Sequence, residues 1–382
     1  MANPGVSLED YQQAETALQE HGGNKSAAAR ALNMNRVTFR NRIESGRRLH
    51  TEARGAFGGT APDGFAIKGV STLYGPDGEV KAEWVKTSAD MVRQQEMMRE
   101  ALDEMARKLP RLPARPKNRK DYTDQLLAFI PWGDPHFGLY TWGEETGDDF
   151  DTDIAKRDLC AAVDYLVSQS PATERCVIAS LGDFYHIDNL SNSTPQSGHP
   201  LDPDTRLRRV VRIGVAAIRQ CISSALERHA TVEFVPIVGN HDPVLSMAMG
   251  VMLGQMYEDE PRVIVHDNAA LRHYVQHGKV LLGLVHGDKT KDRDLPGIMA
   301  TEKPAEWGAS RHRYWHRGHH HHSELMEFNG CTVEQHRTLA AGDAYAVGHG
   351  WLSGRDMKQI IYHADHGEVA RSTCSIDMLR AA

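Results

Sequence analysis

The chain has 382 residues, of which 40% are hydrophobic and 25% are charged, a composition typical of folded globular proteins. Its apolar runs stay below the roughly 18 residues that a membrane-spanning helix needs, which excludes an integral membrane protein. The length predicts two domains, or one large domain with an appendage. The five cysteines are scattered without close pairs and the first residues lack the pattern of a secretory signal, so we expect a cytoplasmic protein with reduced thiols.

Charge and histidine are distributed unevenly along the chain. Residues 1–120 carry 20 Lys and Arg against 15 Asp and Glu, a net charge of +5, whereas the remainder has a net charge of −12. The sequence also contains 21 histidines, many of them beside Gly or Asp in the acidic part. This composition indicates a basic N-terminal region followed by a region rich in metal ligands.

Residues 8–48 show the pattern of three short helices. The first helix ends at the Gly-Gly-Asn break of 22–24, and the second runs through 26–32. A tight turn is expected at 33–35, where Asn33 can adopt the left-handed conformation more easily than most residues. The third helix is expected to begin near residue 36. This arrangement predicts a helix-turn-helix.

The stretch GNKSAAARALNMNRVTFRNRIES resembles the three-helix DNA-binding domain of the Fis-type bacterial regulators. Inward positions of the third helix are Val37, Phe39 and Ile43. In that family this helix enters the major groove of DNA, where arginines contact guanine edges or phosphates. The resemblance therefore implies DNA contacts by the outward residues Arg36, Thr38, Arg40, Asn41 and Arg42. The alternative is a helical bundle that serves only dimerisation.

The region 51–120 is expected to join two folded parts. A hairpin is predicted over 64–85 with its turn at 75–78, and a helix over 88–108 carries methionines at near-helical spacing. These methionines indicate a packing stripe, with a helical dimer seam as the alternative, so a homo-oligomer is possible. The basic, proline-rich segment 107–120 is predicted to be an extended linker.

Five predicted strands in the acidic part each end in Asp, Asn or His. The strand ends are Gly133-Asp134-Pro135-His136, Gly182-Asp183-Phe184-Tyr185-His186, Gly239-Asn240-His241-Asp242, His286-Gly287-Asp288 and Gly318-His319-His320-His321-His322. Strand ends of an α/β sheet are rigid and lie near one another, and glycine lets the backbone approach a shared site. Carboxylate, amide and imidazole ligands without thiolates suit a pair of Mn, Fe or Zn ions.

The order of these motifs resembles the calcineurin-like phosphoesterase (metallophosphoesterase) superfamily over about residues 126–327. The resemblance implies a four-layer α/β/β/α sandwich in 121–382, preceded by a helix-turn-helix domain in 1–50 and the hairpin, helix and linker of 51–120. It also implies a ligand set for two divalent ions. The first ion would be held by Asp134, His136, Asp183 and His321, and the second by Asp183, Asn240, His286 and His319. A shifted pair, His320 and His322, is the alternative within the histidine run.

In this superfamily a hydroxide that bridges the two metals attacks the phosphorus atom. The resemblance implies that His241 binds the phosphate and protonates the leaving oxygen, with Asp242 orienting it. The sequence GDFYH is similar to a motif of the double-strand-break repair nucleases, in which the histidine, here His186, positions the DNA backbone. The order of all segments also resembles phage and prophage metallophosphoesterases, which implies a bacterial or phage-infected cell.

Several segments outside the motifs have structural and functional interpretations. The arginines 206, 208, 209 and 212 and the lysines 289 and 291 are either solvated or contact a phosphate backbone. Residues beyond 327 are expected to form closing strands of the second sheet, in which His349 and His363 are structural.

These patterns together predict a two-metal phosphodiesterase, favoured as a DNA nuclease, with Mn the expected metal and Fe, Zn or Mg the alternatives. A phosphatase or cyclic-nucleotide phosphodiesterase that acts on small molecules is one alternative function. The other is a DNA-binding regulator in which the phosphoesterase fold is only a scaffold.

Overall fold

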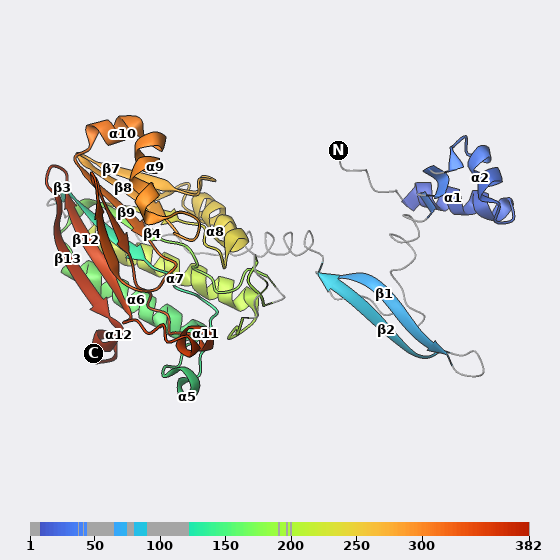
Figure 1. Cartoon of the computed structure of the whole chain (residues 1–382), viewed down its shortest axis with the longest axis horizontal. Coiled ribbons are helices and arrows are strands. Elements are labelled where there is room, and N and C mark those ends of the chain that lie inside the picture. Colours follow the sequence, from blue (N-terminus) through green and yellow to red (C-terminus); the bar gives the residue numbers. More distant parts are fainter. Residues whose placement is uncertain are drawn as a thin grey trace. The chain divides into compact units, whose positions relative to one another are not determined.

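The computed structural model describes residues 8–36, 38–40, 42–43, 65–74, 80–89, 122–189, 192–195, 198 and 201–381 (Figure 1). The chain divides into two compact units, Met1–Glu100 and Ala101–Ala382. Within the described residues, no helix is both long and apolar enough to cross a membrane. The predicted linker 107–120 lies outside the described residues.

Three helical segments form the start of the first unit, as predicted. They are α1 (Leu8–Glu20), α2 (Lys25–Ala31) and a third segment at residues 36, 38–40 and 42–43. Asn24 caps α2 by accepting hydrogen bonds from the amides of Ser26 and Ala27. Asn33 has a φ of +53°, which confirms the left-handed turn predicted there.

The third helical segment is anchored by its apolar residues. Phe39 and Ile43 are buried against alanines of α1 and α2. The side chains of Arg36, Thr38 and Arg40 are exposed and that of Arg42 is half-buried. Val37 and Asn41, assigned to the inner and outer faces of this helix, lie outside the described residues.

The predicted hairpin consists of β1 (Phe65–Tyr74) and β2 (Val80–Ala89), which pair antiparallel. The expected helix does not begin at Ser88, because Ser88 and Ala89 pair with the start of β1 and extend β2. The remainder of that predicted helix, 90–108, lies outside the described residues.

Six strands form the first sheet of the second unit, in the order β13-β12-β3-β4-β5-β6. The strands are β3 (Thr123–Trp132), β4 (Thr173–Ser180), β5 (Thr231–Pro236), β6 (Val263–Val265), β12 (Asp356–His363) and β13 (Gly367–Ser375). The adjacent strands β3, β4, β5 and β6 run parallel to one another, whereas β12 runs antiparallel to both β3 and β13. The carboxyl ends of β3, β4 and β5 therefore lie at one edge of the sheet.

Five strands form the second sheet, in the order β10-β11-β9-β8-β7. The strands are β7 (His273–His277), β8 (Val280–Val285), β9 (His312–Arg317), β10 (Glu324–Phe328) and β11 (Cys331–Gln335). The central strands β8, β9 and β11 are parallel, and the edge strands pair antiparallel.

Helices cover the outer faces of both sheets and complete four layers, α/β/β/α (Figure 1). They are α6 (Thr152–Gln169), α7 (Leu207–Arg228) and α8 (Pro243–Met256) on the first sheet, and α9 (Leu295–Glu302) and α10 (Pro304–Ala309) on the second. Phe129 and Val177 of the first sheet share a buried core with Leu282 and Leu284 of the second. The predicted mixed α/β fold with two sheets is thus confirmed. The short helices are α5 (Gly143–Thr146), α11 (Ala344–Gly348), α12 (Ile376–Ala381) and the 3-10 helix η1 (Asp292–Asp294).

The prediction that all segments beyond residue 327 close the second sheet is wrong in two respects. Strand β11 joins the second sheet, but β12 and β13 extend the first. The run Ile360–Tyr362 is buried on both faces beside β3, which suits an inner strand. Residues 344–348 form α11 instead of a strand. All five cysteines are buried and free, as expected for core thiols.

Candidate metal centre

The predicted ligands lie in the loops that follow five strands. Asp134 and His136 follow β3, Asp183 follows β4, and Asn240 follows β5. The other ligands come from the second sheet, with His286 after β8 and His319 and His321 after β9. Ligands separated by almost 190 residues in sequence are thereby brought to one place.

The backbone of these loops is strained at the ligands themselves. Among the described residues, seven other than glycine have a positive φ, and five of the seven are predicted ligands: Asp134 (46°), His136 (47°), Asp183 (48°), His319 (78°) and His321 (57°). The left-handed conformation costs about 1–2 kcal/mol for a residue with a side chain. Its concentration here indicates that side-chain placement at this site outweighs local backbone preference.

The first group of ligand atoms belongs to Asp134, His136 and His321, which lie within 4.8 Å of one another. The Nε2 atoms of His136 and His321 are 3.1 Å apart, and Nε2 of His321 is 3.7 Å from a carboxylate oxygen of Asp134. Two imidazole nitrogens that face each other at this distance repel unless a proton or a cation lies between them. The arrangement therefore suits a cation.

The second group comprises Asp183, His286 and His319, with Asn240 beside it. Nε2 of His286 lies 3.2 Å from a carboxylate oxygen of Asp183 and 2.9 Å from the amide oxygen of Asn240. Its Nδ1 atom lies 2.8 Å from the carbonyl oxygen of Leu181, so an Nδ1 proton is donated there. With Nδ1 committed to this hydrogen bond, Nε2 is the nitrogen that faces the carboxylate and amide oxygens, and a cation bound among them would take the place of the Nε2 proton.

Two glycines allow the loops to meet. A Cβ atom at Gly239 would overlap the Asp183 carboxylate, and one at Gly318 would overlap the carboxylate of Asp134. Both positions therefore exclude any side chain. The glycines of the Gly-Asn-His and Gly-His motifs are required by this close packing around the two carboxylates.

Electrostatics at the site favour positive charge between the groups. Burial raises the pKa of the Asp183 carboxyl, but the adjacent His286 outweighs burial and brings the pKa below its usual range. Burial lowers the pKa of His286, yet the Asp183 carboxylate raises it to about 10. Burial, followed by His241 and His321, lowers the pKa of His136 well below its usual value. A neutral His136 can donate a lone pair to a cation.

The donor chemistry of the two groups fits two divalent ions. Seven side chains supply two carboxylates, one amide oxygen and four imidazoles, and no thiolate takes part. Nitrogen and oxygen donors of this kind suit Mn, Fe or Zn. His319 and His321 belong to the two groups, whereas the side chains of His320 and His322 are exposed and lie outside them.

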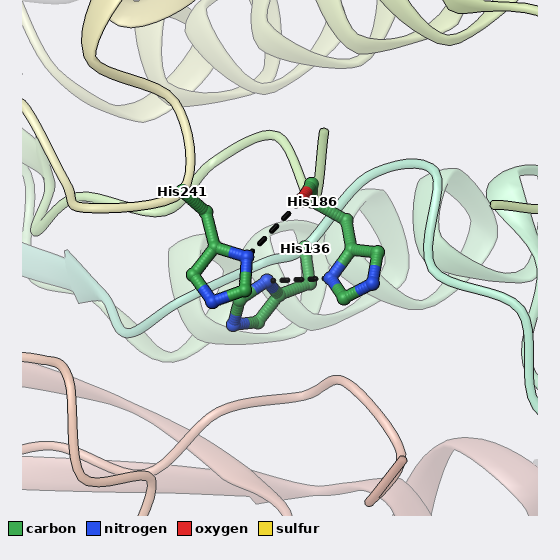
Figure 2. A group of neighbouring side chains, drawn as sticks. All are labelled: His136, His186 and His241. Carbon is green, nitrogen blue, oxygen red and sulfur yellow. Dashed lines mark hydrogen bonds between the residues drawn. The ribbon is translucent and has the colours of Figure 1, made fainter. Parts of the chain in front are cut away.

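Two of the three remaining predicted residues, His186 and His241, lie beside His136 of the first group (Figure 2). Nδ1 of His186 is 3.2 Å from Nδ1 of His136. Nδ1 of His241 is 3.1 Å from the carbonyl oxygen of His186, and the amide of His241 donates to Asp183. Figure 2 shows His186 and His241 on either side of His136.

Asp242 is held by donors other than the ring of His241. Its carboxylate accepts hydrogen bonds from the amide of Tyr185, the hydroxyl of Ser246 and, at 3.3 Å, the amide of Gly239. Burial, followed by the Asp183 carboxylate, raises the pKa of Asp242 to about 7. The carbonyl of His186, and not Asp242, is therefore the group hydrogen-bonded to the His241 ring, and Asp242 braces the loops around it.

The structure also contains a buried group that the sequence motifs did not indicate, formed by His316, Glu334 and His336. His316 Nδ1 lies 2.9 Å from His336 Nε2. Lys358 and Arg371 both pair with Glu334, so its negative charge is already compensated. A cation at this group would meet two further positive charges, which identifies it as a buried polar network that joins the sheets.

Of the basic residues predicted near the site, the arginines 206, 208, 209 and 212 lie at the start of α7. Arg209 pairs with Asp153 on α6, while the side chains of Arg206, Arg208 and Arg212 are exposed. The candidate DNA-binding residues Arg36, Thr38, Arg40 and Arg42 belong to the first unit, and the metal centre belongs to the second.

A comparison with known protein families tests the predicted helix-turn-helix of the first unit. Residues 13–45 match the model of the Fis family of bacterial regulatory proteins. The predicted Fis-type helix-turn-helix is thus confirmed. No curated protein matches the chain.

Similar solved structures carry phosphoesterase names or that of a sorting protein. A predicted phosphoesterase from Streptococcus pneumoniae is 10% identical with a TM-score of 0.28, over 65% of this chain and 98% of that one. An archaeal phosphodiesterase is 13% identical with a TM-score of 0.33, over 65% and 99%. Zinc-complexed Vps29 from Entamoeba histolytica is 11% identical with a TM-score of 0.28, over 65% and 98%. The similarity to repair nucleases stays a prediction.

Proposed function

We propose that residues 121–382 form a phosphodiesterase that uses two divalent ions, with Mn the expected metal. One observation carries the proposal: two groups of possible ligand atoms each contain a buried carboxylate, Asp134 in one and Asp183 in the other. Five of the proposed ligands also have a left-handed backbone conformation. The proposed ligands are Asp134, His136, Asp183 and His321 for one ion and Asp183, Asn240, His286 and His319 for the other.

The charge of the proposed site suits a phosphodiester. Asp134 and Asp183 supply two negative charges, so two bound divalent cations would leave a net charge of about +2. Such ions lower the pKa of a coordinated water and neutralise charge on a phosphoryl group. A phosphodiester anion is attracted to that excess positive charge.

His241 is proposed to serve the leaving group. Its Nδ1 atom lies at the carbonyl oxygen of His186, which accepts the Nδ1 proton, so Nε2 is the nitrogen that can hold a proton for substrate. Its amide is fixed to the Asp183 carboxylate. Both bonds hold the imidazole beside the first ligand group, where it can donate a proton to the departing oxygen.

DNA is proposed as the substrate because a helix-turn-helix is part of the same chain. In this proposal residues 1–50 bind DNA through Arg36, Thr38, Arg40, Asn41 and Arg42, and 51–120 connect them to the catalytic domain. Helices of this type read duplex DNA in the major groove. The helix-turn-helix would therefore bring the acidic catalytic domain to DNA that its net charge of −12 would otherwise repel.

Metal analysis combined with a substrate panel tests the proposal. We expect two Mn ions per chain and cleavage of linear, nicked or single-stranded DNA as well as bis-p-nitrophenyl phosphate. Cleavage of the small diester without any cleavage of DNA would favour the small-molecule alternative. DNA binding without any hydrolysis would favour the scaffold alternative. Duplex affinity that survives deletion of residues 1–50 would contradict the role of the helix-turn-helix.

A further inference from the structure

Beside the metal centre lies a recess with aromatic walls, here called the aromatic recess. It has a volume of about 270 Å³ and is lined by Tyr140, Thr141, Trp142, Glu145, Thr146, Asp202 and Ala344. This volume is close to the roughly 300 Å³ at the lower end of small-molecule sites. It is large enough for one planar ring system.

Two connections place the aromatic recess near the proposed metal ligands. Tyr140 follows His136 by four residues, so their Cα atoms are at most about 14 Å apart. The amide of Leu139, the residue before Tyr140, donates to the carbonyl oxygen of His136 at 3.0 Å, so this stretch of chain turns back toward the ligand loop.

The walls of the aromatic recess are held in place by short helices. Trp142 precedes α5, and Asp343 caps α11 by accepting a hydrogen bond from the amide of Ala346. Helices α5 and α11 contact each other and lie side by side in Figure 1. The amide of Tyr140 donates to the carbonyl oxygen of Asp202, which fixes the third side of the recess.

The aromatic rings here are far more exposed than packing requires. Tyr140 is 48% exposed and Trp142 is 51% exposed, and on α11 and just after it Tyr345 and Trp351 are each 62% exposed. Tyr345 and Trp351 are in ring contact with each other, 5.8 Å between centroids. Large rings left open beside a catalytic centre are suited to stacking against another planar group.

The charges of the aromatic recess select the kind of group that enters. Its charged side chains are both carboxylates, Glu145 and Asp202, and among the described residues neither has a hydrogen-bond or ion-pair partner. Two carboxylates repel a phosphate. They accept hydrogen bonds from the exocyclic amino groups of nucleobases, as Asp and Glu do with cytosine.

We infer that the aromatic recess binds an unpaired nucleobase of the strand whose phosphodiester is cleaved. This inference rests on the proposed nuclease function. A base inside a duplex is stacked on its neighbours and cannot enter a recess, so the substrate strand must be single-stranded or locally unpaired. The metal centre then takes the phosphate and the aromatic recess takes a nearby base.

Binding of short oligonucleotides by the metal-loaded chain with the His241→Ala substitution, in which turnover is slow, tests the inference without appreciable cleavage. The probes are a fluorescein-labelled single-stranded deoxycytidine hexamer and an abasic hexamer with the same phosphates, read by anisotropy with the full chain. We expect the base-bearing hexamer to bind 5- to 150-fold more tightly, since stacking contributes about 1–3 kcal/mol per base. Equal binding of the two hexamers would overturn the inference.

Variants of the recess show where the base is bound, and activity assays test the proposed nuclease function separately. Trp142→Ala and Tyr140→Ala should remove most of the preference for the base-bearing hexamer, whereas Tyr165→Ala, an exposed tyrosine on α6, should retain it. Tyr165→Ala should also leave hydrolysis of bis-p-nitrophenyl phosphate unchanged, and all three variants should keep two metals per chain. Unchanged preference in both recess variants would overturn the inference. Base-dependent binding by a protein that hydrolyses neither DNA nor the small diester would instead contradict the nuclease proposal.

Discussion

The Nδ1 atom of His186 lies 3.2 Å from the Nδ1 atom of His136, while Nε2 of His136 points to the ligand group it shares with His321. One of the two Nδ1 atoms must carry the proton of this hydrogen bond. If Nε2 of His136 binds a cation, its proton is on Nδ1 and is donated to His186. In the proposed site this contact would make His186 a positioning residue for a metal ligand, a role distinct from the DNA contact implied by its motif.

Replacement of His186 by alanine should weaken metal binding at the first group by about 10- to 100-fold, the usual effect of losing the hydrogen-bond partner of a ligating histidine. His186→Gln, whose amide oxygen can accept the same proton, should restore part of the affinity. Calorimetric titration of metal-free protein with Mn measures both effects. Unchanged metal affinity together with lost DNA cleavage would show that His186 acts on substrate instead.

The second prediction concerns His241, which is not a metal ligand in the proposed set. His241→Ala should retain two metals per chain but lower kcat on DNA by about 10²- to 10⁴-fold, the contribution of a general acid. The loss should be smaller on bis-p-nitrophenyl phosphate, because p-nitrophenolate departs without protonation. An equal loss on both substrates would assign His241 to phosphate binding and not to proton transfer.

Local sequence patterns were sufficient to predict the parallel strands and the polar side chains that gather at their carboxyl ends. The loops after β3, β4, β5 and β8 follow largely apolar runs that are buried on both faces, as the residues before Asp134 and Asp183 illustrate. The loop with His319 and His321 instead follows the polar strand β9, HRYWHR. Glycine marks each close approach. The pairing of β12 with β3 is different, because an antiparallel partner brought from 230 residues away leaves no local signal. The His316–Glu334 contact likewise depends on the register between β9 and β11.

The partners of Asp242 also escaped prediction. The motif places Asp242 beside His241, which suggests a direct contact between the side chains. In the structure the chain turns into α8 directly after Asp242, and the carboxylate is directed to Tyr185 and Ser246. The orientation of the Asp242 carboxylate depends on the conformation of the loop after β4, which contains Tyr185. The spacing of residues in the sequence does not predict that conformation.

The third prediction concerns the exposed arginines of the helix-turn-helix. The double variant Arg36→Ala/Arg40→Ala should weaken duplex binding and, if both residues contact phosphates, lower the slope of log affinity against log salt by about 2. Its hydrolysis of bis-p-nitrophenyl phosphate should be unchanged. Arg30→Ala, an exposed arginine of α2, serves as a control for general loss of charge. Anisotropy of labelled duplexes over a range of salt concentrations provides the measurement, and an unchanged slope would argue against phosphate contacts.

The fourth prediction links pH to stability through His273, which is buried on β7. Burial, followed by the nearby His266, lowers the pKa of His273 to about 4, although the hydrogen bond from its Nε2 to the carbonyl oxygen of Ala270 opposes this. Between about pH 6.5 and pH 4 the unfolded chain thus binds a proton at this residue that the folded chain does not. The free energy of unfolding should therefore fall as the pH drops through this window.

His273→Gln keeps a donor for the Ala270 carbonyl but cannot titrate, so it isolates this contribution. Between pH 7 and pH 5 the variant should lose about 1–2 kcal/mol less stability than the original chain. Urea unfolding at both pH values, in EDTA so that metal release does not contribute, measures the difference. Equal losses in the two proteins would mean that His273 takes up its proton without unfolding, which requires its Ala270 hydrogen bond to tolerate the charged imidazole.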